Sequence, residues 1–152
     1  MSKIKATKTK STFRMECAVN TNINSSPEKI WNILTNAAKY VQWNSTIISL
    51  EGKIALGEKI KLKVKLDPKR TFNLKISEFS TPVKMVWEDG MAPMFKGVRT
   101  YTLVKNDDGT TGFTMSEVFS GLMLPMIAGS LPDFAPAFEQ FALDLKKEAE
   151  KN

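Results

Sequence analysis

Few residues of this sequence could carry out chemistry, because its 152 residues include no histidine and only one cysteine, Cys17. Without histidine there is no imidazole general base, no His-based catalytic triad and no His-ligated zinc. A single cysteine excludes an intramolecular disulfide and any Cys-x-x-Cys metal or redox site. The sequence therefore predicts no cofactor and no metal, and it favours a binding protein over an enzyme.

The most informative charged residues are Arg99 and Glu117. A hairpin turning at residues 107–108 would place them opposite each other on the apolar face of two adjacent strands. Charges on such a face must pair, because burying an isolated ion costs several kcal/mol. Two interpretations follow: a structural ion pair near a cavity wall, or a pair that orients a carbonyl or hydroxyl group of a ligand. The same register predicts Leu103 opposite Phe113 and Tyr101 opposite Met115.

Two connectors, 90–95 and 122–127, are unusually apolar and contain four methionines. Loops generally run over the surface, and methionine suits adaptable apolar contacts. We expect these connectors to form the mouth of a ligand cavity; packing under a helix and a dimer or partner surface are the alternatives. The expected mouth residues are Met91, Met94, Phe95, Met123 and Met126.

Alternating apolar and polar residues predict the strands that must position these groups. Each strand has one apolar and one polar face, which is typical of an antiparallel sheet with one solvated side. The alternation is found in segments 13–23, 60–66, 72–77, 83–88, 101–103 and 113–119, with a shorter β-rich stretch at 46–50.

Helices are predicted in two places. Ser26-Pro27-Glu28 is a helix start signal, with a capping hydroxyl, a proline at the first helical position and an acid in the first turn. Apolar residues recur at three- and four-residue steps towards the C-terminus, in a helix expected to begin between Leu131 and Ala135. The predicted fold class is α+β: a curved antiparallel sheet of six to seven strands wrapped around a long C-terminal helix, with one or two short helices after the first strand.

The charge distribution argues against a nucleic-acid partner. Residues 1–12 carry four lysines and no acid, and we expect them to form a disordered basic tail. Without that tail the net charge falls from +6 to +2, because 18 basic and 16 acidic residues remain. Four more lysines, at 61, 63, 65 and 75, are expected on the outer sheet face, as a solvated surface or, alternatively, a contact for anionic lipid or RNA.

No apolar run reaches the length of about 18 residues that a membrane-spanning helix requires. The N-terminus has lysines but no apolar stretch after them, so the sequence predicts no secretory signal and no membrane insertion. The expected location is the cytoplasm, and the expected oligomeric state is a monomer or a homodimer.

Several of these features together resemble the START-like superfamily, the SRPBCC or polyketide-cyclase-like group with the helix-grip fold. The resemblance depends on segments 24–31 and 40–44, on Arg99, on Gly109-Thr110 and on segment 117–121. It implies a single START-like ligand-binding domain over residues 13–150, with an apolar cavity between sheet and terminal helix. It does not imply one chemistry, because function depends on the site rather than on the fold.

Three functions remain open at this point. The first is binding of a small hydrophobic molecule, lipid- or polyketide-like, without catalysis. The second is a cyclase or hydrolase acting on a polyketide-like substrate, with proton transfers by Glu117, Tyr101, Asp89 or water. The third is a co-chaperone or ribosome-associated interaction protein. The expected ligand-binding residues are Met85, Trp87, Arg99, Tyr101, Met115, Glu117, Phe119, Phe134, Phe138 and Phe141.

Overall fold

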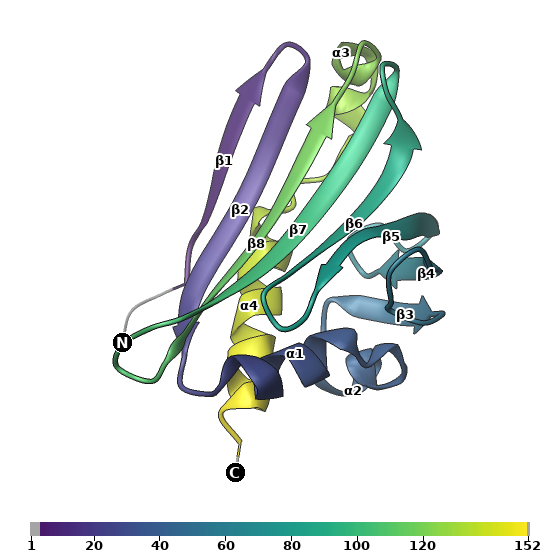
Figure 1. Cartoon of the computed structure of the whole chain (residues 1–152). Helices are drawn as coiled ribbons and strands as arrows, with labels where there is room; N and C mark the ends of the chain where they lie inside the picture. The colour runs from purple at the N-terminus through teal and green to yellow at the C-terminus, as the bar shows by residue number, and fades with distance from the viewer. Residues whose placement is uncertain (1–3, 152) are drawn as a thin grey trace.

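A twisted antiparallel sheet curves around the C-terminal helix α4 (Ala135–Ala149) in the computed structural model, which describes residues 4–151 (Figure 1). The sheet has eight strands in the order β1-β2-β8-β7-β6-β5-β4-β3, so the predicted count of six to seven was too low. The strands are β1 (Ala6–Ser11), β2 (Arg14–Ile23), β3 (Ile47–Glu51), β4 (Lys59–Val64), β5 (Phe72–Ser80), β6 (Lys84–Met91), β7 (Phe95–Lys105) and β8 (Thr111–Ser120).

The alternation read from the sequence sets the two faces of the sheet. In β8, every second residue from Thr111 to Phe119 is buried, and the residues between them are partly exposed. The β7–β8 hairpin has the predicted register, with Arg99 opposite Glu117. The two apolar pairs expected beside it, Leu103 with Phe113 and Tyr101 with Met115, are confirmed.

The prediction of a disordered N-terminal tail is wrong for residues 6–11, which form β1 and pair with β2 along its length. Positions 1–3 of that tail lie outside the described residues. Strand β1 has no apolar face that a sequence pattern could show, because its side chains are alanine, threonine, lysine and serine. Backbone pairing with β2 and two contacts to the C-terminal segment stabilise it instead: the Ala6 amide donates to Glu139 (2.9 Å), and Lys8 pairs with Asp133 (3.0 Å).

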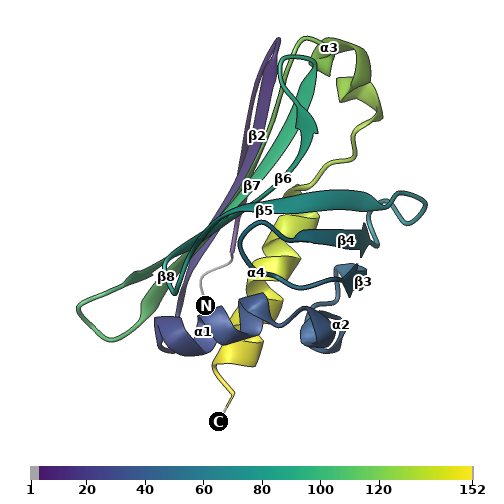
Figure 2. The same ribbon diagram turned by 45° about the vertical axis from the view of Figure 1, so that its right-hand side comes forward.

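The connection from β2 to β3 runs to the opposite edge of the sheet through α1 (Pro27–Thr35), a short 3₁₀ turn (Ala37–Lys39) and α2 (Tyr40–Trp43) (Figure 2). The start signal acts as predicted, since the Ser26 hydroxyl accepts a hydrogen bond from the Lys29 amide (3.2 Å) and Pro27 begins the helix. Tyr40 is fully buried and donates to the Leu34 carbonyl.

After β8, the chain forms α3 (Leu124–Ile127) and a 3₁₀ turn (Ala128–Ser130) before it enters α4. Helix α4 begins at Ala135, within the predicted range, and buries Phe138, Phe141 and Leu145 against the sheet. No helix of residues 4–151 combines the length and apolar character needed to cross a membrane.

Candidate functional site

A cavity lies between the concave face of the sheet and the first half of α4. Its volume is about 50 Å³, and about 770 Å³ is free of atoms when the adjoining open space is included. A volume of 50 Å³ is room for a few water molecules, so an organic ligand must also occupy the adjoining space or displace side chains. The lining residues are Thr46, Ile47, Leu62, Val64, Leu66, Arg70, Phe72, Leu74, Asp89, Phe95, Arg99, Met115, Glu117, Phe119, Phe134, Ala137, Phe138 and Phe141.

Arg99 and Glu117 form an ion pair in the cavity wall. The Arg99 Nε donates to Glu117 Oε1 at 2.8 Å, and the two side chains are only 13% and 12% exposed. The Arg99 guanidinium also lies over the ring of Phe138 on α4, 5.1 Å from its centre, a favourable cation–π arrangement. The pair thus links β7 and β8 to α4 across the wall of the cavity.

A second carboxylate, that of Asp89, lies close to this pair. The register places Asp89 of β6 opposite Gly97 of β7, one inward-facing row away from Arg99. A Cβ atom at position 97 would lie 3.4 Å from an oxygen of Asp89 and 3.4 Å from an oxygen of Glu117. Glycine therefore keeps open the space on which both carboxylates converge.

Asp89 differs from Glu117 in having no hydrogen bond or ion pair with any residue of 4–151. Burial raises the pKa of Asp89, and the nearby Arg70 cation opposes the rise. An acceptor that no protein donor satisfies is suited to a donor group of a ligand.

Burial also acts on the ion pair. It raises the pKa of Glu117, an effect that Arg99 opposes and Asp89 reinforces. Burial alone would lower the pKa of Arg99, but the Glu117 carboxylate raises it above its usual range, so Arg99 remains a cation. The pKa of the neighbouring Tyr101 rises to about 12, chiefly through burial, which makes this phenol a poor proton donor or acceptor at neutral pH.

The mouth of the cavity is formed by the β4–β5 connection, which contributes Leu66 and Arg70, rather than by the methionine-rich connectors. Arg70 is exposed and lies over the ring of Phe72, 4.6 Å from its centre. Alternation identified Leu62, Leu66 and Phe72 as inward-facing, but it could not show that their strands reach the cavity. That placement depends on the order of strands in the sheet, which local sequence does not encode.

Seven of the ten predicted ligand-binding residues line the cavity, and three do not. Met85, Trp87 and Tyr101 are fully buried on the same concave face but lie outside the cavity. Tyr40 packs against Trp87, with ring centres 6.2 Å apart, and Phe141 packs against Tyr101, with ring centres 6.0 Å apart. The residues of the predicted set that line the cavity are Arg99, Met115, Glu117, Phe119, Phe134, Phe138 and Phe141.

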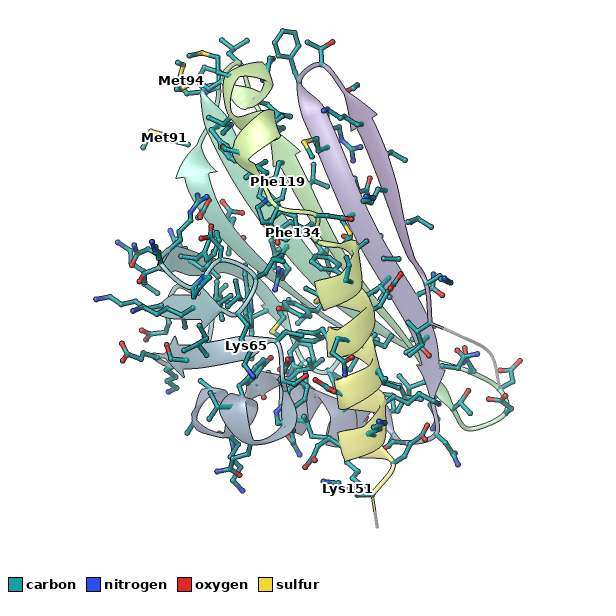
Figure 3. The ribbon with its side chains drawn as sticks, turned by 180° about the vertical axis from the view of Figure 1, so that it is seen from behind. Lys65, Met91, Met94, Phe119, Phe134 and Lys151 are labelled. Carbon is teal, nitrogen blue, oxygen red and sulfur yellow. The ribbon has the colours of Figure 1, made fainter. Side chains whose placement is uncertain are left out.

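The predicted mouth residues need a larger correction, because only Phe95 lines the cavity. Its ring contacts Phe119, which in turn stacks on Phe134 at the start of α4, with ring centres 5.3 Å apart (Figure 3). Met91, Met94, Met123 and Met126 lie on the outside of the molecule instead. The β6–β7 turn extends past the end of α4 and therefore past the cavity.

The cavity contains no nucleophile paired with a base, and residues 4–151 contain no group of three or more His, Cys, Asp or Glu side chains that could hold a metal ion. Its walls are mainly aromatic and aliphatic, and they include two arginines and two acids. This combination of apolar walls and a few converging polar groups is typical of small-molecule sites.

No protein-family model matches the sequence, and no curated protein matches it. Solved structures do match. A START superfamily protein from Mycobacterium smegmatis has a TM-score of 0.65 and 17% identity, with 89% of this chain and 97% of that chain covered. The conserved protein EF2215 from Enterococcus faecalis, of unknown function, has a TM-score of 0.67 and 15% identity, with 97% and 78% covered.

A third similar structure is DynU16, a protein of the dynemicin biosynthetic locus. Its TM-score is 0.63 and its identity 15%, with 88% of this chain but only 46% of DynU16 covered. At such identities the similarity shows the fold alone. The fold is START-like, as the resemblance implied.

Proposed function

We propose that this protein binds a small hydrophobic molecule carrying a polar end, in the cavity between the sheet and α4. The observation that carries the proposal is the placement of the Arg99–Glu117 pair and the unpaired Asp89 in the wall of an apolar cavity. Apolar walls would hold the body of the ligand. Arg99 would donate to a carbonyl or hydroxyl oxygen, and Asp89 would accept a hydrogen bond from a hydroxyl or amine.

Entry requires movement of aromatic side chains, because the volume of the cavity is small. Phe134 is the best placed to move, since it is partly exposed and directly precedes α4. The ligand would then lie between the Phe119 and Phe138 rings. We expect the protein to act in the cytoplasm, as a monomer or a homodimer.

Binding of the neutral fluorescent probe N-phenyl-1-naphthylamine tests this proposal. Ala137→Trp adds a large ring to a residue that lines the cavity, whereas Gln140→Trp adds the same ring on the exposed side of α4. We expect the wild type and Gln140→Trp to enhance probe fluorescence and Ala137→Trp to lose the enhancement. Equal probe binding by all three proteins would place the probe outside this cavity and contradict the proposal.

An enzymatic function is the second candidate, and the convergence of Asp89 and Glu117 on Gly97 favours it. Two carboxyl groups in one cavity can divide the roles of proton donor and acceptor when their environments differ. The similarity to DynU16, from a biosynthetic locus, is consistent with a cyclase or hydrolase acting on a polyketide-like substrate. Turnover that Glu117→Gln abolishes, with ligand binding retained, would establish this function over simple binding.

A further inference from the structure

Outside the cavity, the most conspicuous feature is a group of exposed apolar side chains at one end of the sheet. Three connectors meet there: the β1–β2 turn, the β6–β7 turn and the segment from Gly121 to Met126. We call this region the apolar tip. Six of the twelve exposed large hydrophobic residues of 4–151 belong to it, with exposed fractions from 36% to 79%. They are Phe13, Met91, Met94, Leu122, Met123 and Met126.

Backbone hydrogen bonds fix the three connectors to one another. The Gly121 amide donates to the Phe13 carbonyl (3.1 Å), and the Leu122 and Met123 amides donate to the carbonyls of Pro93 and Met94 (both 2.9 Å). Gly121 has a φ of +131°, and a Cβ atom there would lie 2.3 Å from the Met94 carbonyl oxygen. These contacts therefore fix the backbone conformation of the apolar tip, in which the six apolar side chains are exposed.

The position of the apolar tip separates it from the ligand cavity. In Figures 1 and 2, α3 and the ends of the β1–β2 and β6–β7 hairpins lie together at the end of the molecule opposite α1. Met91 and Met94 lie at this end in Figure 3, beyond the level of Phe119 and Phe134. The region projects from the sheet, and its side chains come from turns rather than from a groove.

On the strands that lead to the apolar tip, the basic residues lie closer to the turns than the acids with which they pair. Segments 11–15, 90–95 and 121–132 contain no acid, and the basic residues nearest the exposed side chains are Lys10, Arg14 and Lys96. Arg14 and Lys96 pair with acids further along the strands, Glu16 (2.9 Å) and Glu88 (3.1 Å). Asp89, the acid next to the β6–β7 turn, lines the cavity instead.

We propose that the apolar tip docks on membranes that contain anionic lipids. The methionine, leucine and phenylalanine side chains enter the boundary between headgroups and acyl chains, while Lys10, Arg14 and Lys96 face the headgroups. Docking of this kind is peripheral and needs no membrane-spanning helix.

A membrane suits this surface better than a second copy of the chain. A stable protein interface needs about 1,000 Å² or more of surface with good shape complementarity, whereas the side chains of the apolar tip project from three turns instead of lining a groove. A lipid boundary accepts apolar side chains one by one, without shape complementarity, and flexible methionines adapt to it.

Co-sedimentation with vesicles tests the proposal. The vesicles contain phosphatidylcholine and phosphatidylglycerol at about three to one, or phosphatidylcholine alone. The test variant is Met91→Gln/Met126→Gln, and the matched control is Leu56→Gln/Val104→Gln, which alters two apolar residues elsewhere that are also more than half exposed. We expect the wild type and control to bind the anionic vesicles, and the test variant to bind them at least about tenfold more weakly.

A fluorescent label reports the depth of docking. Nitrobenzoxadiazole attached to Met126→Cys should shift to the blue on addition of the anionic vesicles, and the same label at Leu56→Cys should not. Cys17 does not interfere, because it is buried and burial is the main cause that raises its pKa to about 11, which keeps the thiol unreactive.

Three results would overturn the proposal. The first is wild-type protein that binds no anionic vesicles at low salt, or binds vesicles of phosphatidylcholine alone equally well. The second is binding that Met91→Gln/Met126→Gln leaves unchanged, which would assign it to lysines elsewhere. The third is a wild-type dimer in analytical ultracentrifugation that the test variant converts to monomer, which would assign the apolar tip to a second copy of the chain.

Discussion

At the scale of single residues, the ion pair between Arg99 and Glu117 is both a structural element and a candidate recognition group. Replacing Arg99 with methionine leaves the Glu117 carboxylate buried without a partner, so we expect a loss of about 3–5 kcal/mol in the free energy of unfolding. Exposed ion pairs contribute only about 0.2–1 kcal/mol. Urea unfolding of Arg99→Met and Glu117→Leu measures the two losses.

The double variant Arg99→Met/Glu117→Leu separates the two roles of the pair. We expect it to recover much of the lost stability, because two apolar side chains suit the concave face. If the pair serves recognition, the double variant folds stably but no longer binds the ligand. Retained binding would make the pair structural only, and single variants that each lose less than about 1 kcal/mol would show that the charges face water.

Asp89 gives a prediction about pH. Burial raises its pKa above the ordinary value of 3.8, so the folded state binds the proton more tightly than the unfolded state does. The contribution of Asp89 to stability is therefore complete below pH 3.8 and is lost as the pH rises through the raised pKa.

Asp89→Asn removes this titration. We expect the variant to be more stable than the wild type at pH 7, and its advantage to shrink as the pH falls towards 4. The measurement is the difference in unfolding free energy between the two proteins across that range. An advantage independent of pH, or a variant less stable at pH 7, would show that Asp89 is ionised without penalty in the folded protein.

The sequence locates Glu117 in the fold better than it locates Asp89. A short turn fixes the β7–β8 register, so the sequence alone predicts Arg99 opposite Glu117, as the structure has it. For Asp89, the sequence suggests only a role in proton transfer. Its place in the cavity depends on β6 lying next to β7 and on the absence of a side chain at Gly97.

At the scale of elements, the α1–α2 connection decides how much of the concave face is free. Tyr40 and Phe141 fill the space in front of Trp87 and Tyr101, and the Tyr40 hydroxyl is bonded to the Leu34 carbonyl. Sequence patterns showed Trp87 and Tyr101 to be inward-facing, but not that a tyrosine distant in sequence would cover them. Strand β1 was missed for a related reason, since its stability comes from partners rather than from its own apolar residues.

Tyr40→Ala tests this filling role. We expect a loss of about 3–5 kcal/mol in the free energy of unfolding, as for other large-to-small changes at fully buried aromatic residues. We also expect stronger binding of N-phenyl-1-naphthylamine, because the cavity would extend to Trp87. Tyr40→Phe is the control, since it removes the hydroxyl but keeps the ring; enhanced probe binding by this control would contradict the role assigned to the ring.

At the scale of the whole molecule, the sheet, its grip on α4 and the position of the cavity follow from alternation, helix signals and the START-like resemblance. The extent of the cavity does not, because it is set by long-range packing of aromatic side chains. The connectors at 90–95 and 122–127 illustrate the limit. The sequence shows their apolar composition but not their position relative to α4, and of the five residues predicted at the cavity mouth only Phe95 lines the cavity.

The central claim, that the cavity holds a small hydrophobic molecule, is tested most directly by native mass spectrometry of the protein purified from its own host. We predict a mass above that of the bare chain, carried by the wild type and by Gln140→Trp and absent from Ala137→Trp, with the excess mass removed by organic extraction. The bare mass in all three proteins, or an adduct that Ala137→Trp retains, would contradict the claim.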